Sequence, residues 1–226
     1  MTTLRPELGV LPARIARLPL DARGYPVPWF VAWMHGVPEF RVMDPDKYVR
    51  AIRERRCWVC GDTLGKHLAF VIGPMCAINR TSAEPPCHHE CAVWSVQHCP
   101  FLSRPQMVRR EDALTDTCIR GEAAIMRNPG AAGVWTTTRF RLHRRQDASA
   151  SGYLIEMGDP ERVEWFAGGR PATRAEVEAS IDSGLPLLLE ATTHEVTERD
   201  RTAARAVLVQ RRAEIDALLP PPEACL

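Results

Sequence analysis

Two pairs of metal-ligand residues lie close together in the first half of the sequence. Cys57 and Cys60 have two residues between them and are followed at once by Gly61, and His88 and Cys91 have the same spacing. The first pair is typical of a zinc knuckle, a tight turn whose glycine lets backbone amides point at thiolates. The second pair opens an expected helix, where residues three apart share a face and the N-terminus favours a thiolate. We therefore expect these two cysteine and histidine pairs to bind one zinc ion.

Other ligand sets remain open at this point. Cys87 or His89 could replace His88, and six of the eight cysteines lie between residues 56 and 103, which would also allow an iron–sulfur cluster. The compact cysteine run of a ferredoxin is absent, so zinc is the preferred cofactor. If His88 were not a ligand, three thiolates would leave a position open to water beside Glu90, as in a catalytic site. The roles of Cys76, Cys87, Cys99 and Cys118 are left open.

Composition limits the classes of function. The chain has 226 residues, of which 45% are hydrophobic and 25% charged, as in ordinary soluble globular proteins that bury a core without disulfides. Arginines and prolines interrupt the apolar residues of the N-terminus, and no apolar run is long enough to span a bilayer. We expect a cytoplasmic protein with reduced cysteines and no membrane partner. Phosphate-loop, dinucleotide and hydrolase motifs are absent, so no small-molecule substrate is evident.

Charge is unevenly distributed along the chain. The formal net charge is only +1, which argues against a dedicated non-specific nucleic-acid binder. Residues 150 to 226 hold 8 Lys and Arg against 14 Asp and Glu, a net charge of −6, which leaves +7 for the residues before them. The basic part contains the ligand pairs. Such asymmetry suits a first part that meets phosphate, or two parts that attract each other.

The first half of the sequence predicts an extended arm at 1–28 and an adjoining unit at 29–130. Aromatic and β-branched residues at 29–34 and 39–43 indicate two short strands joined by a turn at His35 and Gly36. Asp44 and Pro45 begin a helix over 46–56. After the knuckle, 67–78 is expected to form a β-hairpin with its turn at Gly73 and Pro74, followed by a helix over 92–98.

The second half, 131–226, is expected to form a hairpin and helices that pack with 29–130 as one compact unit. Alternation over 134–143 and 153–157 predicts the hairpin, after irregular chain at 101–117 and a short helix at 118–130. Thr173 and Glu176 form a capping box for a helix over 174–181, which is closed by Ser183, Gly184 and Pro186, and residues 185–190 are expected to begin another helix. The longest helix is expected over 195–219. Its inward face is expected to consist of Ala203, Ala206, Val207, Ile215 and Leu218. The expected fold class is α+β, with the metal module inside a mixed domain.

Five stretches carry a resemblance to known sequences: RGYPVPWFVAW, RRCWVCG, AFVIGPMCAINR, EPPCHHECA and VEWFAGGRPATRAEVEASIDSGLP. Together they resemble uncharacterised proteins encoded in phage and prophage genomes of high-GC bacteria, over about residues 24 to 190. This resemblance implies an accessory role in the cytoplasm of a bacterial host and no assigned activity. Residues 57 to 98 also resemble treble-clef zinc fingers in their order of knuckle, hairpin and helix.

Treble clefs include the His-Asn-His nucleases, so an enzyme is the alternative hypothesis. That family implies a histidine base on the hairpin and a metal-binding histidine, for which His67, His88 and His89 are candidates. The usual Asp-His or His-His pair is missing, because Phe70, Val71 and Ile72 occupy its position. The alternative is therefore a metal-dependent enzyme that cuts or modifies nucleic acid, with no catalytic residue identified.

The preferred hypothesis is a non-enzymatic, zinc-stabilised accessory protein. Nucleic acid is the first partner considered, because arginines line one side of the expected helix at 46–56 and the expected strand at 134–143. A host protein is the second, through an aromatic surface that could include Trp29, Trp33 and Trp94. The candidate nucleic-acid contacts are Arg50, Arg53, Arg56, Arg139 and Arg141.

Overall fold

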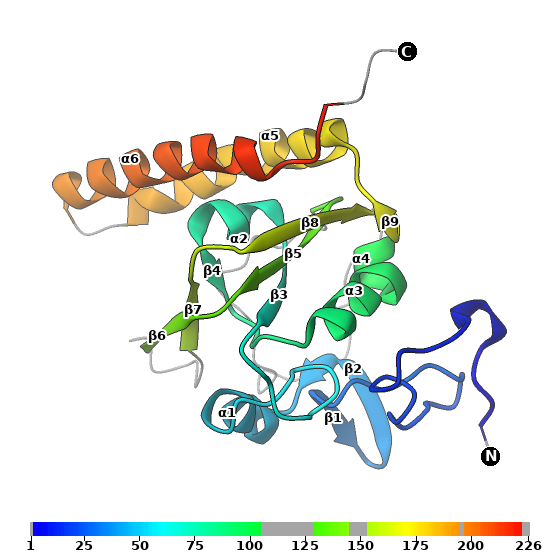
Figure 1. Cartoon of the computed structure of the whole chain (residues 1–226). Helices are drawn as coiled ribbons and strands as arrows, with labels where there is room; N and C mark the ends of the chain where they lie inside the picture. The colour runs from blue at the N-terminus through cyan, green and yellow to red at the C-terminus, as the bar shows by residue number, and fades with distance from the viewer. Residues whose placement is uncertain (1, 105–128, 145–152, 195–196, 223–226) are drawn as a thin grey trace.

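The computed structural model describes residues 2–104, 129–144, 153–194 and 197–222 of the chain (Figure 1). The described residues form an α+β fold, as expected, with three antiparallel sheets. The strand orders of these sheets are β1-β2, β3-β5-β8-β9 and β4-β7-β6. None of the described helices is both long and apolar enough to cross a membrane.

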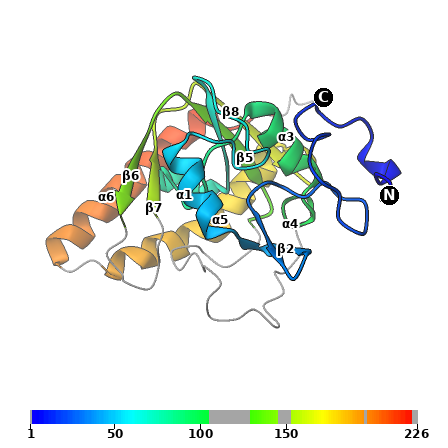
Figure 2. The same ribbon diagram turned by 90° about the horizontal axis from the view of Figure 1, so that it is seen from below.

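The N-terminal segment contains a short 3-10 helix, Pro6–Leu8. Its residues Ile15 and Val27 are buried in the fold. The strands β1 (Val31–Met34) and β2 (Val37–Met43) then pair as predicted. Their turn uses two residues with positive φ, His35 at 51° and Gly36 at 80°, which suits a tight hairpin. Figure 2 views this part of the molecule from below.

Helix α1 (Pro45–Arg53) begins where the sequence predicts and ends three residues early. The Asp44 side chain accepts hydrogen bonds from the backbone amides of Asp46 and Lys47, at 3.0 and 3.1 Å. Tyr48 and Ile52 are buried on its inner side. Arg55 then adopts a positive φ of 52°, which ends the helix and turns the chain into the knuckle.

The hairpin predicted at 67–78 is wrong. Strand β3 (Leu68–Ile72) is formed, but Gly73 and Pro74 begin helix α2 (Pro74–Asn79) instead of a turn between strands. Proline at the first helical position supports such a start, because its fixed φ is helical and the missing N–H is not needed there. Strand β3 pairs instead with β5 (Ala132–Thr137), while the return segment forms β4 (Thr81–Ser82) and one isolated bridge between Ala69 and Cys87.

Helix α3 (His89–His98) is confirmed, and the His88 and Cys91 pair lies at its start, as expected. A short helix, α4 (Pro100–Ser103), follows in place of the irregular chain expected from residue 101. The remainder of that expected irregular segment, and most of the helix predicted at 118–130, lie outside the described residues.

The single strand predicted over 134–143 is two strands in the structure. Strand β5 ends at Thr137 and strand β6 (Phe140–Arg144) begins three residues later, and these two strands belong to different sheets. The hairpin of β6 with β7 (Tyr153–Met157) is confirmed. Strands β8 (Arg162–Ala167) and β9 (Arg170–Pro171) complete the larger sheet. Every residue of β5 is buried, and both α2 and α3 contact it, so this strand lies at the centre of the core.

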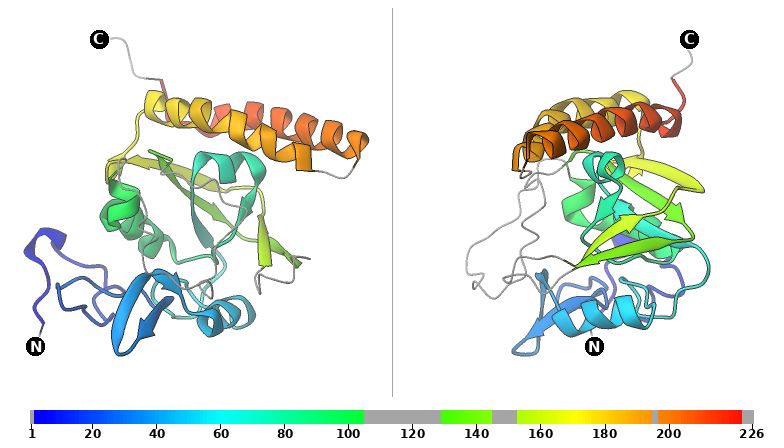
Figure 3. Two further views of the ribbon diagram at one scale, coloured as in Figure 1. Left: turned by 180° about the vertical axis from the view of Figure 1, so that it is seen from behind. Right: turned by 90° about the vertical axis from the view of Figure 1, so that its left-hand side faces the viewer.

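Two long helices lie side by side across the sheets, as Figures 1 and 3 show. Helix α5 (Arg174–Ala191) has the predicted capping box but runs through Pro186 without a break, so the prediction of two helices there is wrong. A 3-10 turn (Thr192–His194) precedes helix α6 (Glu198–Ile215), and another (Asp216–Leu218) follows it.

The inward face predicted for the last helix is partly wrong. Leu208 and Ile215 are the buried residues of α6, whereas Val207 is 44% exposed. Ala203 and Ala206 are also exposed. The last predicted inward residue, Leu218, is half-buried beyond the helix.

Candidate metal centre

The first two ligand residues are held by the tight turn of the knuckle. The Cys57 amide donates to the Asp62 carbonyl at 2.7 Å, and the Gly61 amide donates to the Cys57 carbonyl at 2.9 Å. The backbone amide of Cys60 points at Cys57 Sγ, 3.5 Å away. The turn therefore brings both thiols to one side and directs a backbone donor at sulfur, which stabilises a thiolate.

Gly61 is required by this turn for two reasons. Its φ is +79°, a conformation that residues with a side chain rarely adopt. A Cβ at this position would also lie 2.8 Å from ring atoms of Trp29, which packs against the knuckle. The indole ring of the first strand region thus closes one side of the metal-binding turn.

The second pair of ligands lies at the start of α3. His88 is the N-cap residue and Cys91, which is fully buried, belongs to the first turn. The His88 backbone amide donates toward Cys57 Sγ at 3.4 Å, so the two pairs are already in contact. The positive end of the helix dipole faces the cluster and favours the negative charge of its thiolates.

The four ligand atoms converge on one point. Those of Cys57, Cys60, His88 and Cys91 all lie within 4.8 Å of one another, and Cys60 Sγ is 3.4 Å from His88 Nδ1. The other ring nitrogen, Nε2, lies 3.1 Å from the Thr63 carbonyl, to which it donates. That hydrogen bond places the proton on Nε2 and leaves the Nδ1 lone pair for a metal.

The electrostatics of the thiols favour a cation at this point. Burial raises the pKa of the Cys57 thiol, but contacts from Cys60, Cys87 and Cys91 outweigh burial and hold that pKa well below its usual range. Its contact with Cys57 raises the pKa of Cys60 to about 11, and the same contact raises the pKa of Cys91. One thiolate therefore opposes ionisation of its neighbours, and a bound divalent cation would remove that conflict.

The alternative ligands lie outside this cluster. Cys87 is buried against Cys57, and its backbone is occupied in two hydrogen bonds with Ala69. His89 points to β8, where its Nε2 lies 2.5 Å from a Glu164 carboxylate oxygen. Burial is the main factor that raises the pKa of Cys76 and of Cys99. The arrangement is a Cys3His group, and it gives no support to a cluster with more thiolate ligands.

The nuclease interpretation also lacks its structural context. The hairpin that would carry a catalytic histidine is replaced by β3 and α2, and His67 pairs with Glu161 through a 2.9 Å contact. A His-Asn-His site needs its base beside the metal-binding histidine, whereas His67 has a carboxylate partner contributed by the segment before β8.

An arginine of the N-terminal segment contacts both halves of the centre, which no local pattern in the sequence predicts. Arg14 contacts Asp62 of the knuckle at 2.8 Å and Glu90 of α3 at 2.7 Å, and Arg17 also contacts Asp62. Asp62 directly follows the Gly61 of the ligand turn, and Glu90 lies in the first turn of the ligand helix. The role of Arg14 could not be predicted from sequence, because Arg14 and Asp62 are 48 positions apart.

The predicted nucleic-acid contacts lie in two places, on and after α1 and on the β6–β7 hairpin, and Arg56 among them reaches the knuckle, where it donates to the Gly61 carbonyl at 3.3 Å. Arg50 and Arg56 both pair with Glu54, while Arg53 is exposed on α1. Arg139 pairs with Asp159 at 3.3 Å, and Arg141 is exposed on β6. Helix α1 and the β6–β7 hairpin abut, since the Tyr48 hydroxyl donates to the Tyr153 carbonyl at 2.9 Å.

Comparison of this chain with known protein families, with curated proteins and with solved structures finds no match in any of the three. The geometry supports a small domain with a metal-binding Cys3His group, for which zinc fits best because three thiolates and one imidazole are its usual structural ligands.

Proposed function

We propose that this protein is a zinc-stabilised, non-enzymatic accessory protein that binds nucleic acid. A group with four ligands, two of them fully buried, suits a closed structural site better than a catalytic site with an open position. The metal then fixes the knuckle and α3, while binding is left to the surface. The resemblance to phage-encoded proteins is compatible with such an accessory role in a bacterial host.

The observation that carries the proposal is the contact between α1 and the β6–β7 hairpin. It brings the exposed Arg53 and the exposed Arg141 to adjoining elements, although 88 positions separate them in the sequence. Several arginines on adjoining elements can follow the phosphates of a nucleic-acid backbone, and such contacts release condensed counterions. Because the C-terminal part of the sequence is acidic, the net charge of the chain is only +1, and the positive charge is confined to the first part.

The test is binding of a labelled DNA duplex by wild type and by Arg53→Glu over a series of salt concentrations. We expect wild-type affinity to fall steeply with salt and the variant to bind at least about tenfold more weakly, with no change in sequence preference. The matched control is Arg199→Glu, which makes the same charge change at an exposed position of α6. Equal binding by all three proteins would refute α1 as part of a nucleic-acid surface.

A host protein remains the second candidate partner because of an exposed apolar group at the β1–β2 turn. Trp33, Met34 and Val37 are 45%, 44% and 65% exposed. Association through this group would bury apolar surface and would be insensitive to salt, unlike association through arginines.

A further inference from the structure

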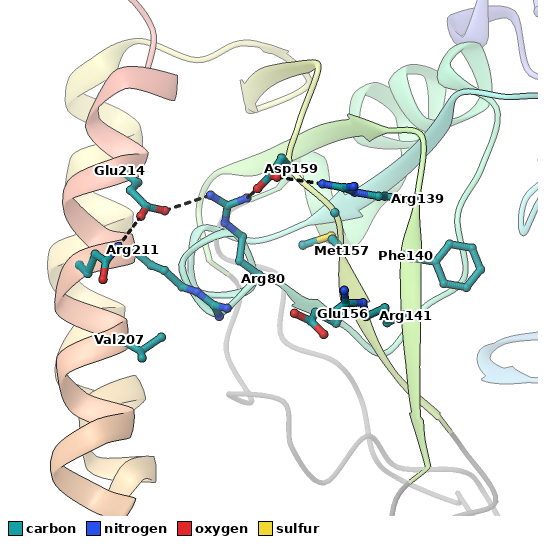
Figure 4. A pocket seen from close by; sticks show the side chains of 12 residues that line it. Arg80, Arg139, Phe140, Arg141, Glu156, Met157, Asp159, Val207, Arg211 and Glu214 are labelled. Atoms are coloured by element: carbon teal, nitrogen blue, oxygen red, sulfur yellow. Dashed lines mark hydrogen bonds and ion pairs between the residues drawn. The ribbon is translucent and has the colours of Figure 1, made fainter.

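A groove lies between helix α6 and the β6–β7 hairpin (Figure 4). Its volume is about 450 Å³, and its lining is polar. Four arginines line it, against three carboxylates. The arginines are Arg80, Arg139, Arg141 and Arg211; the carboxylates are Glu156, Asp159 and Glu214.

Arg80 is the most deeply placed of these arginines. Its side chain is only 12% exposed, and its guanidinium lies 4.7 Å from the centre of the Trp135 ring. The two terminal nitrogens make long contacts, 3.4 Å to Asp159 and 3.2 Å to Glu214. Its Nε is buried and has no hydrogen-bond partner within the described part of the chain. The charged group is therefore shielded from water yet incompletely paired, which strengthens its attraction for an anion.

The backbone around the groove holds these arginines in fixed positions. The Met157 amide donates to the Arg80 carbonyl at 2.8 Å, and the next amide, of Gly158, donates to the Arg139 carbonyl at 3.0 Å. A Cβ on Gly158 would lie 2.7 Å from that Arg139 carbonyl oxygen, so only glycine permits this approach. The backbones of two arginines from distant parts of the sequence are thus tied to two consecutive residues, Met157 and Gly158.

Asp159 marks the position that an anion would take. Its carboxylate bridges Arg80 at 3.4 Å and Arg139 at 3.3 Å, and its side chain is 79% exposed. Both distances exceed the roughly 2.7–2.9 Å of a strong charged hydrogen bond. Long contacts to a carboxylate as exposed as this one are weak, so a phosphate with more charge and more acceptor oxygens can displace the carboxylate.

The other two carboxylates have partners of their own. Glu156 lies 2.9 Å from His143 Nε2, on the outer part of the hairpin. Glu214 accepts from Gln210 at 3.1 Å as well as from Arg80. Arg211 donates one nitrogen to the Asn79 carbonyl at 2.7 Å, which anchors its side chain at the groove. Glu156 and Glu214 are therefore each held by hydrogen-bond donors, and both remain charged.

We propose that this groove is a phosphate-binding site in which Arg80 and Arg139 bind one phosphate group. The phosphate displaces the Asp159 carboxylate from these two arginines, and Arg141 lies at the rim. The inference deepens the proposed function, on which it rests, because a nucleic-acid phosphate is the expected source. A free phosphorylated compound presents the same chemistry.

Three variants test the site without removing the buried Arg80. The probes are inorganic pyrophosphate, followed by calorimetry, and a labelled single-stranded DNA of twelve nucleotides. Arg139→Gln is expected to weaken binding of both probes about tenfold, and Asp159→Asn is expected to strengthen it several-fold because the competing charge is gone. Arg199→Gln, an exposed position of α6 outside the lining, is the control and should bind as wild type does.

The outcomes separate the groove from the wider proposal. If both probes respond to the two groove variants, nucleic acid is the source of the phosphate and both proposals stand. If pyrophosphate responds but wild type does not bind DNA, the groove stands as a site for a free phosphorylated compound and nucleic-acid binding fails. If DNA binding responds to Arg53→Glu and neither probe responds to the groove variants, the groove is refuted alone. If wild type binds neither probe and does not bind the DNA duplex, both are refuted.

Discussion

His88 has a different task for each of its ring nitrogens. Nδ1 faces Cys60 Sγ at 3.4 Å, whereas Nε2 donates to the Thr63 carbonyl. The knuckle therefore supplies two ligands and also the hydrogen bond that orients a third. A substitution at the ligand itself should remove metal, whereas one at a cysteine that only touches the cluster should not.

Zinc content distinguishes these two kinds of residue. We expect about one zinc per chain in wild type and Cys87→Ala, and close to none in Cys91→Ala, as measured by mass spectrometry on protein purified without added metal. Loss of a structural zinc should also lower the free energy of unfolding by several kcal/mol, because metal binding is coupled to folding. Full zinc content in Cys91→Ala would exclude that cysteine as a ligand, and iron with sulfide in wild type would exclude zinc.

The four ligands could be proposed from sequence because each pair is local. Residue type, a spacing of two and an adjacent glycine define the knuckle, and a helix start defines the other pair. The contacts of Arg14 and the groove of Arg80 and Arg211 could not be proposed in this way. They depend on packing between segments about 50 to 130 residues apart, which no local pattern encodes.

Among the elements, α5 shows how a helix start can contribute to stability in a pH-dependent way. Thr173 accepts from the Glu176 amide at 3.3 Å, and the Glu176 carboxylate accepts from the Thr173 amide at 2.9 Å. Arg170 is the main group that lowers the pKa of Glu176, to about 2, and the Thr173 amide adds to the effect. Because the folded-state pKa lies below the unfolded value, the carboxylate stabilises the fold fully above pH 4.5, and this contribution is lost as pH falls toward 2.

Glu176→Gln isolates that charge, since glutamine can still complete the capping box. We expect a loss of about 1 kcal/mol in urea unfolding at pH 7, because solvent screens a pair at this partly exposed position. The difference from wild type should be constant between pH 7 and pH 5 and should shrink below pH 4.5. Asp182→Asn, at an exposed position of the same helix, is the control. A difference that does not vary with pH would contradict the assigned role of the charge.

Element type was hardest to predict where a short apolar run meets Gly-Pro. Such a pair can turn a hairpin or begin a helix, and the choice in the structure follows from β5, which pairs with β3 in place of a neighbouring strand. Long-range pairing also explains why 134–143 is divided between two sheets, because β5 pairs with β3 whereas β6 pairs with β7. Helix α5 continues through Pro186 because that residue is exposed and the residues around it, Gly184 and Leu188, pack inward.

Across the whole molecule, the N-terminal segment and the metal centre form one unit. Ile15 is fully buried, and the adjacent Arg14 contacts carboxylates on both sides of the Cys3His group. Each of these part-exposed ion pairs contributes little alone, but together they connect three separate segments around the metal. Separation of the knuckle from α3 therefore requires both contacts to break, and we expect this to slow metal release.

Arg14→Ala should accordingly speed the transfer of zinc to a chelating dye by about two- to fivefold, without a change in zinc stoichiometry. Arg5→Ala is the matched control, because Arg5 pairs with Glu7 inside the same segment. The measurement is the rate of dye colour change at low ionic strength and again at high salt, where the difference should diminish. Identical rates for wild type and both variants would show that the segment does not restrain the centre.

The pairing of β3 with β5 has a consequence during synthesis. All four ligand positions leave the ribosome about forty residues before β5 does, and β5 is the strand that lies between β3 and β8. The metal can thus join the knuckle to α3 while the sheet that will cover them still lacks its middle strand. Until β5 emerges, the nascent chain therefore exposes β3 as an unpaired edge, open to chaperones, proteases or other chains.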